Sequence, residues 1–139
     1  MAAPRVIESP TAAEAATVAE FRVALRRFLR QTEIVARECG ITPSWYMLLL
    51  QIKGAPDLSE QTTVTALAQR LQLAQSSVTE LVARAVKAGL IVRSPSRDDA
   101  RVVHLRLSAK GEEVFARAFR SLTAEREALQ AAVADLDTA

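Results

Sequence analysis

Charged side chains crowd the eight residues Ser-Pro-Ser-Arg-Asp-Asp-Ala-Arg at positions 94–101. Arg97 and Arg101 carry guanidinium groups, which bind phosphate well. Asp99 stands two residues before Arg101 and can hold that guanidinium through a charge-assisted hydrogen bond. The neighbouring pair of Asp98 and Asp99 suits acid–base chemistry poorly, because a tip between two short strands does not fix two carboxylates at one separation. The stretch therefore favours contact with a polyanion over catalysis.

The sequence contains no other arrangement typical of an enzyme. It has a single histidine, His104, and a single cysteine, Cys39, and it has neither a glycine-rich phosphate loop nor spaced metal ligands. We therefore expect no catalytic activity, no metal and no cofactor. His104 is expected to face solvent, with a phosphate contact or a response to mild acid as alternatives. Cys39 is expected to pack in the core, with oxidant sensing as the alternative.

Basic side chains gather in the middle of the chain. Residues 1–61 carry seven basic and seven acidic side chains, whereas residues 62–110 carry eight basic and three acidic ones, a net charge of +5. Residues 111–139 carry three basic and six acidic side chains, a net charge of −3. Because phosphate contacts supply most of the sequence-independent affinity for DNA, the basic segment favours a DNA-binding surface. Ordinary solvated surface charge is the alternative.

The size and composition of the chain favour one helical domain. Its 139 residues are half apolar and only 4% aromatic, so Leu, Val, Ile and Ala must build the core. No stretch approaches the ~18 uninterrupted apolar residues of a membrane span, and the first residues lack the apolar run of a signal peptide. We therefore expect a cytoplasmic protein that does not bind membranes.

Two helices are expected over residues 14–57, after a mobile tail at residues 1–13. The first should end at Gly40 in a left-handed conformation. The second should begin with Thr42 as N-cap and Pro43 at the first helical position. An apolar stripe runs along the first helix at steps of three and four. It comprises Val18, Phe21, Leu25, Phe28, Thr32, Val35 and Cys39.

A pair of short helices joined by a tight turn should follow. Thr63 would cap the first, and the second should run from Gln75 to Ala88 and end at Gly89. Such a pair is a helix-turn-helix, in which the N-terminal residues of the second helix read base edges in the major groove. The inward residues of the second helix should be Val78, Leu81, Val82 and Ala85. The candidate DNA contacts on it are Gln75, Ser76, Ser77, Thr79, Arg84 and Lys87.

The charged stretch at positions 94–101 lies between two runs of strand-like alternation, which predicts an antiparallel hairpin over residues 90–107. Beside a helix-turn-helix, such a ribbon is a wing. It would lay Arg97 and Arg101 along a minor groove or its phosphates. We therefore expect residues 58–108 to form a winged helix-turn-helix lobe.

These features resemble the multiple-antibiotic-resistance regulator (MarR) family of winged-helix transcription factors. The resemblance rests on residues 65–111, which include Asp-x-Arg at the wing tip and Leu107-Ser108-x-x-Gly111 at the entry to the next helix. It implies a mainly α fold with a small antiparallel β-wing. It also implies a homodimer with interlocked N- and C-terminal helices, a pseudo-palindromic DNA operator, and often an anionic or phenolic effector that abolishes binding.

Two positions depart from the family pattern. Glu80 stands where many members have a basic residue, so it would accept a hydrogen bond from cytosine or simply face solvent. Gln72 replaces a glycine that is frequent in the turn, at a small expected cost.

The resemblance also implies an effector cleft near Trp45, Tyr46 and Phe28, where an aromatic ring could stack on a ligand. Core packing is the alternative, most of all for Tyr46.

Residues 109–139 should form C-terminal dimerisation helices, capped by Ser108, with a kink near Ser121 and Thr123 as a further cap. They carry a second apolar stripe. Together with the stripe on the first helix, it exceeds what a small winged-helix domain covers, so we expect a two-fold homodimer. The second stripe comprises Phe115, Phe119, Leu122, Leu129, Val133 and Leu136.

The sequence therefore predicts a dimeric, sequence-specific regulator of transcription that binds double-stranded DNA. We interpret it as a repressor that a small aromatic or anionic effector releases, by changing the spacing of the two recognition helices. The alternative is a winged helix that binds an acidic protein surface without specific DNA binding. Residues 75–107 lack the exposed aromatic anchors that such an interface usually needs.

Overall fold

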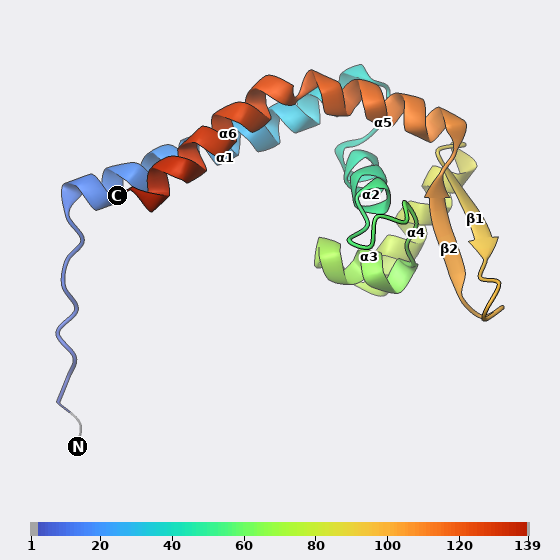
Figure 1. Ribbon diagram of the computed structural model, residues 1–139, viewed down its shortest axis with the longest axis horizontal. Helices are drawn as coiled ribbons and strands as arrows, with labels where there is room; N and C mark the ends of the chain where they lie inside the picture. Colours follow the sequence, from blue (N-terminus) through green and yellow to red (C-terminus); the bar gives the residue numbers. More distant parts are fainter. Residues whose placement is uncertain (1–2, 139) are drawn as a thin grey trace. The chain divides into compact units, whose positions relative to one another are not determined.

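A computed structural model describes residues 3–138 as a mainly helical chain with one two-stranded antiparallel sheet (Figure 1). The predicted fold class is confirmed. The chain divides into two compact units: one comprises the residues up to Gln31 and those from Thr123 onwards, and the other runs from Thr32 to Leu122. Within the described residues, no helix combines the length and the hydropathy needed to cross a membrane.

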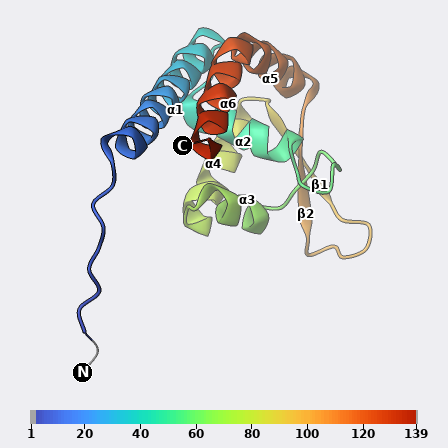
Figure 2. The ribbon, with the colours of Figure 1, turned by 60° about the vertical axis from the view of Figure 1, so that its left-hand side comes forward.

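The first unit consists mainly of two helices. The part of α1 (Ala12–Glu38) that precedes Thr32 lies beside α6 (Thr123–Asp137) in Figures 1 and 2. α1 begins two residues before the predicted Glu14 because Thr11 and Glu14 form a capping box. The Thr11 amide donates to Oε2 of Glu14 at 3.0 Å, and the Glu14 amide donates to Oγ1 of Thr11 at 3.1 Å. Residues 3–11 have no regular secondary structure.

The second unit begins with the end of α1 and with α2 (Pro43–Lys53), both as predicted. Gly40 adopts a φ of +81°, the left-handed conformation that ends α1. Oγ1 of Thr42 accepts a hydrogen bond from the Trp45 amide at 3.1 Å, and Pro43 occupies the first helical position. The side chains of α2 supply the centre of the core, where three of them are completely buried: Leu48, Leu49 and Ile52.

α3 (Val64–Leu71) and α4 (Gln75–Lys87) form the predicted helix-turn-helix. Oγ1 of Thr63 caps α3 by accepting from the Ala66 amide at 3.2 Å. The turn after α3 passes through Gln72 at φ 56° and ψ 44°, the left-handed region in which glycine is unstrained. A side chain there costs on the order of 1 kcal/mol, so the expectation of a small cost at this position understates the strain.

The wing consists of β1 (Ile91–Pro95) and β2 (Val103–Leu107), which pair antiparallel with Ile91 opposite Leu107. Ile91 and Leu105 anchor the ribbon, since each is only 1% exposed. The second edge of β2 pairs with Thr62, whose amide donates to the Leu105 carbonyl at 3.2 Å and whose carbonyl accepts from the Leu105 amide at 2.8 Å. The sequence did not predict this bridge, because a single residue shows no alternation.

α5 (Ala109–Ser121) connects the wing to the core through Ser108, the predicted cap. Oγ of Ser108 accepts from the Gly111 amide at 3.0 Å and donates to the Gly89 carbonyl at 2.5 Å, so it also fixes the end of α4. Gly111 lies against the backbone of Leu90, where a Cβ would collide with the Leu90 carbonyl oxygen. The Ser-x-x-Gly spacing thus has a physical reason: it brings α5 to the α4–β1 junction.

Part of the second apolar stripe is buried inside the second unit. Phe115 is 7% and Leu122 is 1% exposed, and the Phe115 ring stacks on Tyr46 with ring centroids 5.9 Å apart. The second unit therefore covers the α5 part of this stripe itself, because its core extends to Leu122. α5 ends at Ser121, where the kink was predicted, and α6 begins at Thr123, directly after Leu122. α6 itself, over its described residues, has no buried side chain.

Candidate nucleic-acid interface

The exposed side of α4 carries the polar residues predicted to read DNA. Gln75, Ser76, Ser77 and Thr79 are all exposed, and they stand on a helix anchored from the other side by the buried Val78. Ala74 gives α4 no side-chain cap, so within the described chain no side chain accepts from its first amides. Small hydroxyl and amide groups on a firmly packed helix permit close approach to base edges. The other buried residues of α4 are Val82 and Ala85, whereas Leu81 is half-buried.

An ion pair occupies the middle of the same helix. Nη2 of Arg84 lies 2.5 Å from Oε1 of Glu80, and the two side chains are 67% and 66% exposed. Glu80 therefore already accepts a hydrogen bond from Arg84, one turn away, instead of merely facing solvent. This pair reduces the net positive charge on the exposed side of α4 and leaves Lys87, also exposed, as the cation near its C-terminal end.

The wing tip holds Arg101 in the way that its sequence predicts. The Asp99 carboxylate accepts from the amide and from the guanidinium of Arg101, while the Arg101 side chain remains 91% exposed. Backbone hydrogen bonds from Ser96 to the Val102 carbonyl (2.8 Å) and from Val102 to the Asp99 carbonyl (3.0 Å) close the tip. Asp99 thus orients a cation, and the second predicted arginine of the tip, Arg97, is exposed as well.

His104 is less exposed than the sequence predicted. It lies half-buried on β2 opposite Ser94, and its Nδ1 is buried without a hydrogen-bond partner among the described residues. The ring helps to line a cavity of about 360 Å³ formed with the loop from Ala55 to Thr63. The prediction that His104 simply faces solvent is wrong, because this loop is tied to the second edge of β2 through Thr62.

The aromatic residues predicted to contact an effector have different surroundings. Tyr46 is 4% exposed and stacked on Phe115, so core packing accounts for it. Trp45 is half-buried against the same core. Phe28 is half-buried and belongs to the other compact unit. Contact of these residues with an effector stays a prediction. Cys39 packs against the core as expected.

Lys110 fixes the end of α4. It is one of the eight basic residues of segment 62–110, whose net positive charge favoured a DNA-binding surface. Nζ of Lys110 donates to the Ala88 carbonyl at 3.1 Å. A lysine ammonium at the C-terminus of a helix satisfies a free carbonyl and interacts favourably with the helix dipole. Together with Ser108, Lys110 joins the C-terminal end of α4 to α5. No pattern in the sequence indicates this hydrogen bond, since its partners are 22 residues apart.

A cluster of three charged side chains joins α2, the loop before α3, and α5. Nζ of Lys53 binds the carboxylate of Glu60 and lies 3.0 Å from Oε2 of Glu112. Hydrogen bonds to Glu60 and then to Glu112 raise the pKa of Lys53, and the bond from Lys53 lowers the pKa of Glu60. In the same loop, the hydroxyl and amide of Ser59 donate to Asp57 and lower the pKa of its carboxyl. These contacts fix the position of the loop before α3, and Thr62 at the end of this loop pairs with Leu105 of the wing.

Comparison with known proteins points to a single family. Residues 40–102 match the family model described as the MarR family. A Thauera aromatica protein, named for a role as transcriptional regulatory protein for the hcr operon, is 31% identical over 114 residues. The match covers 82% of this chain and 64% of that protein, so the chain spans less than two thirds of the length of this relative.

Solved structures share the fold. The transcriptional regulator Tm0710 from Thermotoga maritima is 27% identical with a TM-score of 0.61, and the match covers 83% of this chain and 76% of that one. A mutant MarR from E. coli complexed with operator DNA is 20% identical with a TM-score of 0.67, over 84% and 85% of the two chains. The regulatory names of these proteins agree with the prediction that this chain is not an enzyme. In its winged helix-turn-helix, its Asp99–Arg101 wing tip and these matches, the chain is similar to proteins of the MarR family.

Proposed function

We propose that this chain is a sequence-specific DNA-binding regulator of transcription that acts as a homodimer on a pseudo-palindromic operator. One observation carries the proposal. A single compact unit contains both an α4 that exposes Gln75, Ser76 and Thr79 and a wing on which Asp99 orients Arg101. A helix that fits the major groove and a ribbon that presents a cation beside it are the parts that read bases and bind phosphates. The operator DNA bound to the E. coli relative supports this use of the fold.

The homodimer is supported by apolar surface on α1 and α6. Val18 and Leu29 of α1 are each 53% exposed, and Val133 of α6 is 44% exposed. Exposed leucine and valine side chains on a helix gain free energy when a second surface covers them, at roughly 25 cal/mol per Å² of apolar area. A two-fold dimer is the commonest arrangement that covers the same surface on two copies. Two recognition helices about 34 Å apart would then meet successive turns of one face of DNA.

We interpret the protein as a repressor that a small aromatic or anionic compound releases, in the cytoplasm where it can reach chromosomal DNA. Trp45, the single tryptophan of the chain, is half-buried and thus a direct reporter of ligand contact near α2. Benzoate and phenol, titrated against the protein bound to its operator, serve as probes. A change in tryptophan emission at the concentration that releases DNA supports an effector at this site. If neither benzoate nor phenol releases DNA, a small aromatic or anionic effector loses its support.

The experiment that tests the proposed function is selection of bound sequences from a random duplex library at about 150 mM salt. The selected duplex is then titrated over a series of salt concentrations. We expect an enriched palindrome with half-sites about ten base pairs apart and affinity that falls steeply with salt. Weak binding without enrichment would contradict the proposal and favour a winged helix that binds an acidic protein surface.

A further inference from the structure

The loop between α2 and α3 supports the wing along its second edge. Thr62, at the end of this loop, exchanges two backbone hydrogen bonds with Leu105 of β2, at 2.8 and 3.2 Å. A two-stranded ribbon alone is marginally stable and twists strongly, and a third segment along its edge restricts it. Arg101 stands at the tip of the same ribbon, between β1 and β2. The position of its guanidinium therefore depends on the loop that carries Thr62.

This loop holds a backbone conformation that its residues disfavour. Leu58 adopts a φ of 62° and Glu60 a φ of 58°, both in the left-handed region that costs free energy for residues with a Cβ. Such a conformation persists only where neighbouring contacts fix it. The side chain of Leu58 is 86% exposed, so its own packing contributes little. The hydrogen bonds between Ser59 and Asp57 flank Leu58, and the ion pair with Lys53 fixes Glu60.

Lys53 ties the loop to the rest of the second unit. Its ammonium binds the Glu60 carboxylate, lies 3.0 Å from Oε2 of Glu112 and donates to Oε1 of Glu112 at 3.1 Å. Lys53 is the last residue of α2, which packs against both α5 and β2. The hydrogen bond from Lys53 and, to a smaller extent, the charge of Arg106 on β2 lower the pKa of Glu60. Glu60 is therefore attracted both by a cation of α2 and by a cation of the wing.

We propose that Lys53 is a positioning residue for DNA binding. By fixing Glu60, it holds the loop in its left-handed conformation, and through Thr62 it holds the ribbon that carries Arg101. Lys53, Glu60 and Glu112 together carry a net charge of −1, so the cluster itself does not attract phosphate. Its effect on DNA has to pass through the wing. This inference rests on the proposed function, and it adds to the DNA-binding machinery a residue that lies outside α4 and the wing.

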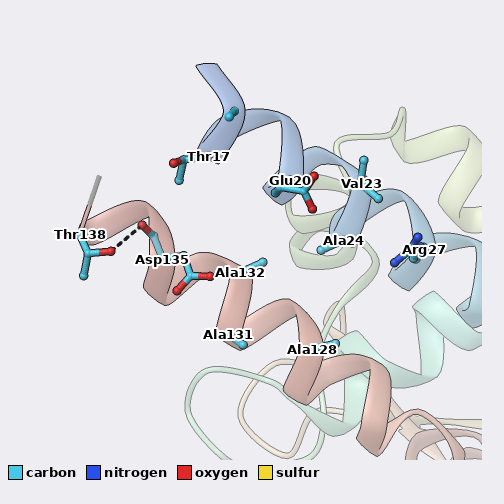
Figure 3. A pocket seen from close by; sticks show the side chains of 11 residues that line it. Thr17, Glu20, Val23, Ala24, Arg27, Ala128, Ala131, Ala132, Asp135 and Thr138 are labelled. Carbon is cyan, nitrogen blue, oxygen red and sulfur yellow. Dashed lines mark hydrogen bonds between the residues drawn. The ribbon is translucent and has the colours of Figure 1, made fainter. Parts of the chain in front are cut away.

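Lys53 lies outside the helices whose apolar surface supports the homodimer. Figure 3 shows a cavity of about 650 Å³ between α1 and α6, with Ala24 and Ala128 among the residues of the first unit that line it. Lys53, Glu60 and Glu112 belong to the second unit and do not line this cavity. A substitution in the cluster should therefore leave the homodimer intact. Sedimentation velocity verifies this for each variant, and it separates an effect on the wing from loss of the dimer.

Two substitutions with opposite changes of charge test the proposal. Lys53→Met removes a positive charge and Glu60→Gln removes a negative one, so charge alone would weaken DNA binding in the first and strengthen it in the second. We expect both variants to bind a selected duplex about threefold to tenfold more weakly than the wild type, because each releases the loop. Lys53→Arg keeps the ion pairs and should bind like the wild type. Fluorescence anisotropy at about 150 mM salt measures the affinities.

The matched control is Arg117→Met. Arg117 is exposed on α5, and its substitution changes the net charge as much as Lys53→Met does. It should leave the affinity for the selected duplex as in the wild type. Because Glu60→Gln keeps the size of the side chain, it tests the proposal even where Lys53→Met fails to fold.

A double-mutant cycle tests the route through the wing. In Arg101→Ala the contact of the wing with phosphate is already lost, so the addition of Lys53→Met should cost less than about twofold in affinity. Native-state hydrogen exchange gives a second readout without DNA. The amides of Thr62 and Leu105, which form the bridge, should exchange about tenfold faster in Lys53→Met than in the wild type, and at the wild-type rate in Lys53→Arg.

The outcomes distinguish this inference from the proposed function. A wild type that binds its selected duplex, together with unchanged affinity in both variants, stronger binding by Glu60→Gln or additive losses in the cycle, would overturn only the inference. Unchanged exchange of the two bridge amides in Lys53→Met would do the same. A wild type that selects no sequence from the library would reject the proposed function, and a role of Lys53 in DNA binding with it.

Discussion

The carboxylate of Asp99 accepts hydrogen bonds from the amide of Arg101 at 3.0 Å, from its Nε at 3.3 Å and from its Nη2 at 3.5 Å. Because the Arg101 side chain is 91% exposed, this ion pair adds little to the stability of the fold. Its effect is on orientation, since a guanidinium that is already held loses less conformational freedom when it binds a phosphate. The guanidinium of Arg101 is therefore already oriented before it binds a phosphate.

Arg101→Ala should weaken binding to every duplex sequence alike. The slope of log affinity against log salt should decrease by about 0.9 for each phosphate that Arg101 neutralises in the wild type. Fluorescence anisotropy with a selected and a scrambled duplex measures both quantities. Arg117→Ala, which removes an exposed arginine from α5, is the matched control and should change neither. An unchanged salt slope in the Arg101 variant would show that the wing does not bind phosphate.

Glu80→Gln should strengthen non-specific DNA binding. The Glu80 carboxylate pairs with Arg84 at 2.5 Å on the exposed side of α4, so its replacement frees a guanidinium and removes a negative charge that would face the DNA. The exposed pair contributes only about 0.3 to 0.5 kcal/mol to folding, so the protein should remain stable. We expect higher affinity for scrambled duplex and a steeper salt dependence. Equal affinity in Glu80→Gln and wild type would mean that this turn of α4 stays away from the phosphates.

Gln72→Gly should stabilise the protein. Gln72 adopts φ 56° and ψ 44°, which glycine reaches without strain, and relief of this strain should raise the free energy of unfolding by about 0.5 to 1 kcal/mol. Urea unfolding measures the change. The matched control is Gln69→Gly, at an exposed position inside α3, which should lower the free energy of unfolding by about 1 kcal/mol. Destabilisation by both substitutions would refute a left-handed Gln72.

The features that the sequence predicted depend on residues close together in the chain. Thr42 and Ser108 cap helices within three residues, and Asp99 and Arg101 pair within two. The Glu80–Arg84 pair is also local, and the four-residue spacing of opposite charges could have indicated it. In the candidate interface, helical periodicity placed Gln75 and its polar neighbours outside because Val78 and Val82 must lie inside.

The features that the sequence did not predict join residues far apart in the chain. Thr62 pairs with Leu105, and Lys53 binds Glu112, which is 59 residues away. Neither pairing produces a periodic signal, because each depends on how α2, the loop before α3 and β2 come together. The partial burial of His104 follows from the same packing, which alternation along β2 alone does not indicate. The extension of the core to Phe115 likewise depends on packing between distant segments.

The unfolding free energy should decrease in acid because of the loop before α3. Lys53 lowers the pKa of Glu60, and Ser59 lowers the pKa of Asp57, so both carboxylates are favoured in the folded state. A group whose folded pKa is lowered stabilises the protein above its unfolded pKa, and this stability disappears as pH falls through the folded value. Urea unfolding at about pH 7 and at a series of values below about pH 4 should show this decline.

Lys53→Gln separates the contribution of Glu60 from that of Asp57 to the loss of unfolding free energy in acid. It removes the main cause of the lowered pKa of Glu60 but leaves the Ser59–Asp57 hydrogen bonds, so the acid decline should become smaller without disappearing. The variant should also lose less unfolding free energy than the wild type as pH rises into the alkaline range. The reason is that the raised pKa of Lys53 stabilises the folded wild type below the pKa of Lys53 in the unfolded state, and this stability disappears as pH rises through the folded value. Lys87→Gln, an exposed lysine of α4, should leave both limbs as in the wild type. Identical pH profiles for Lys53→Gln and Lys87→Gln would show that the Lys53–Glu60–Glu112 cluster does not form in solution.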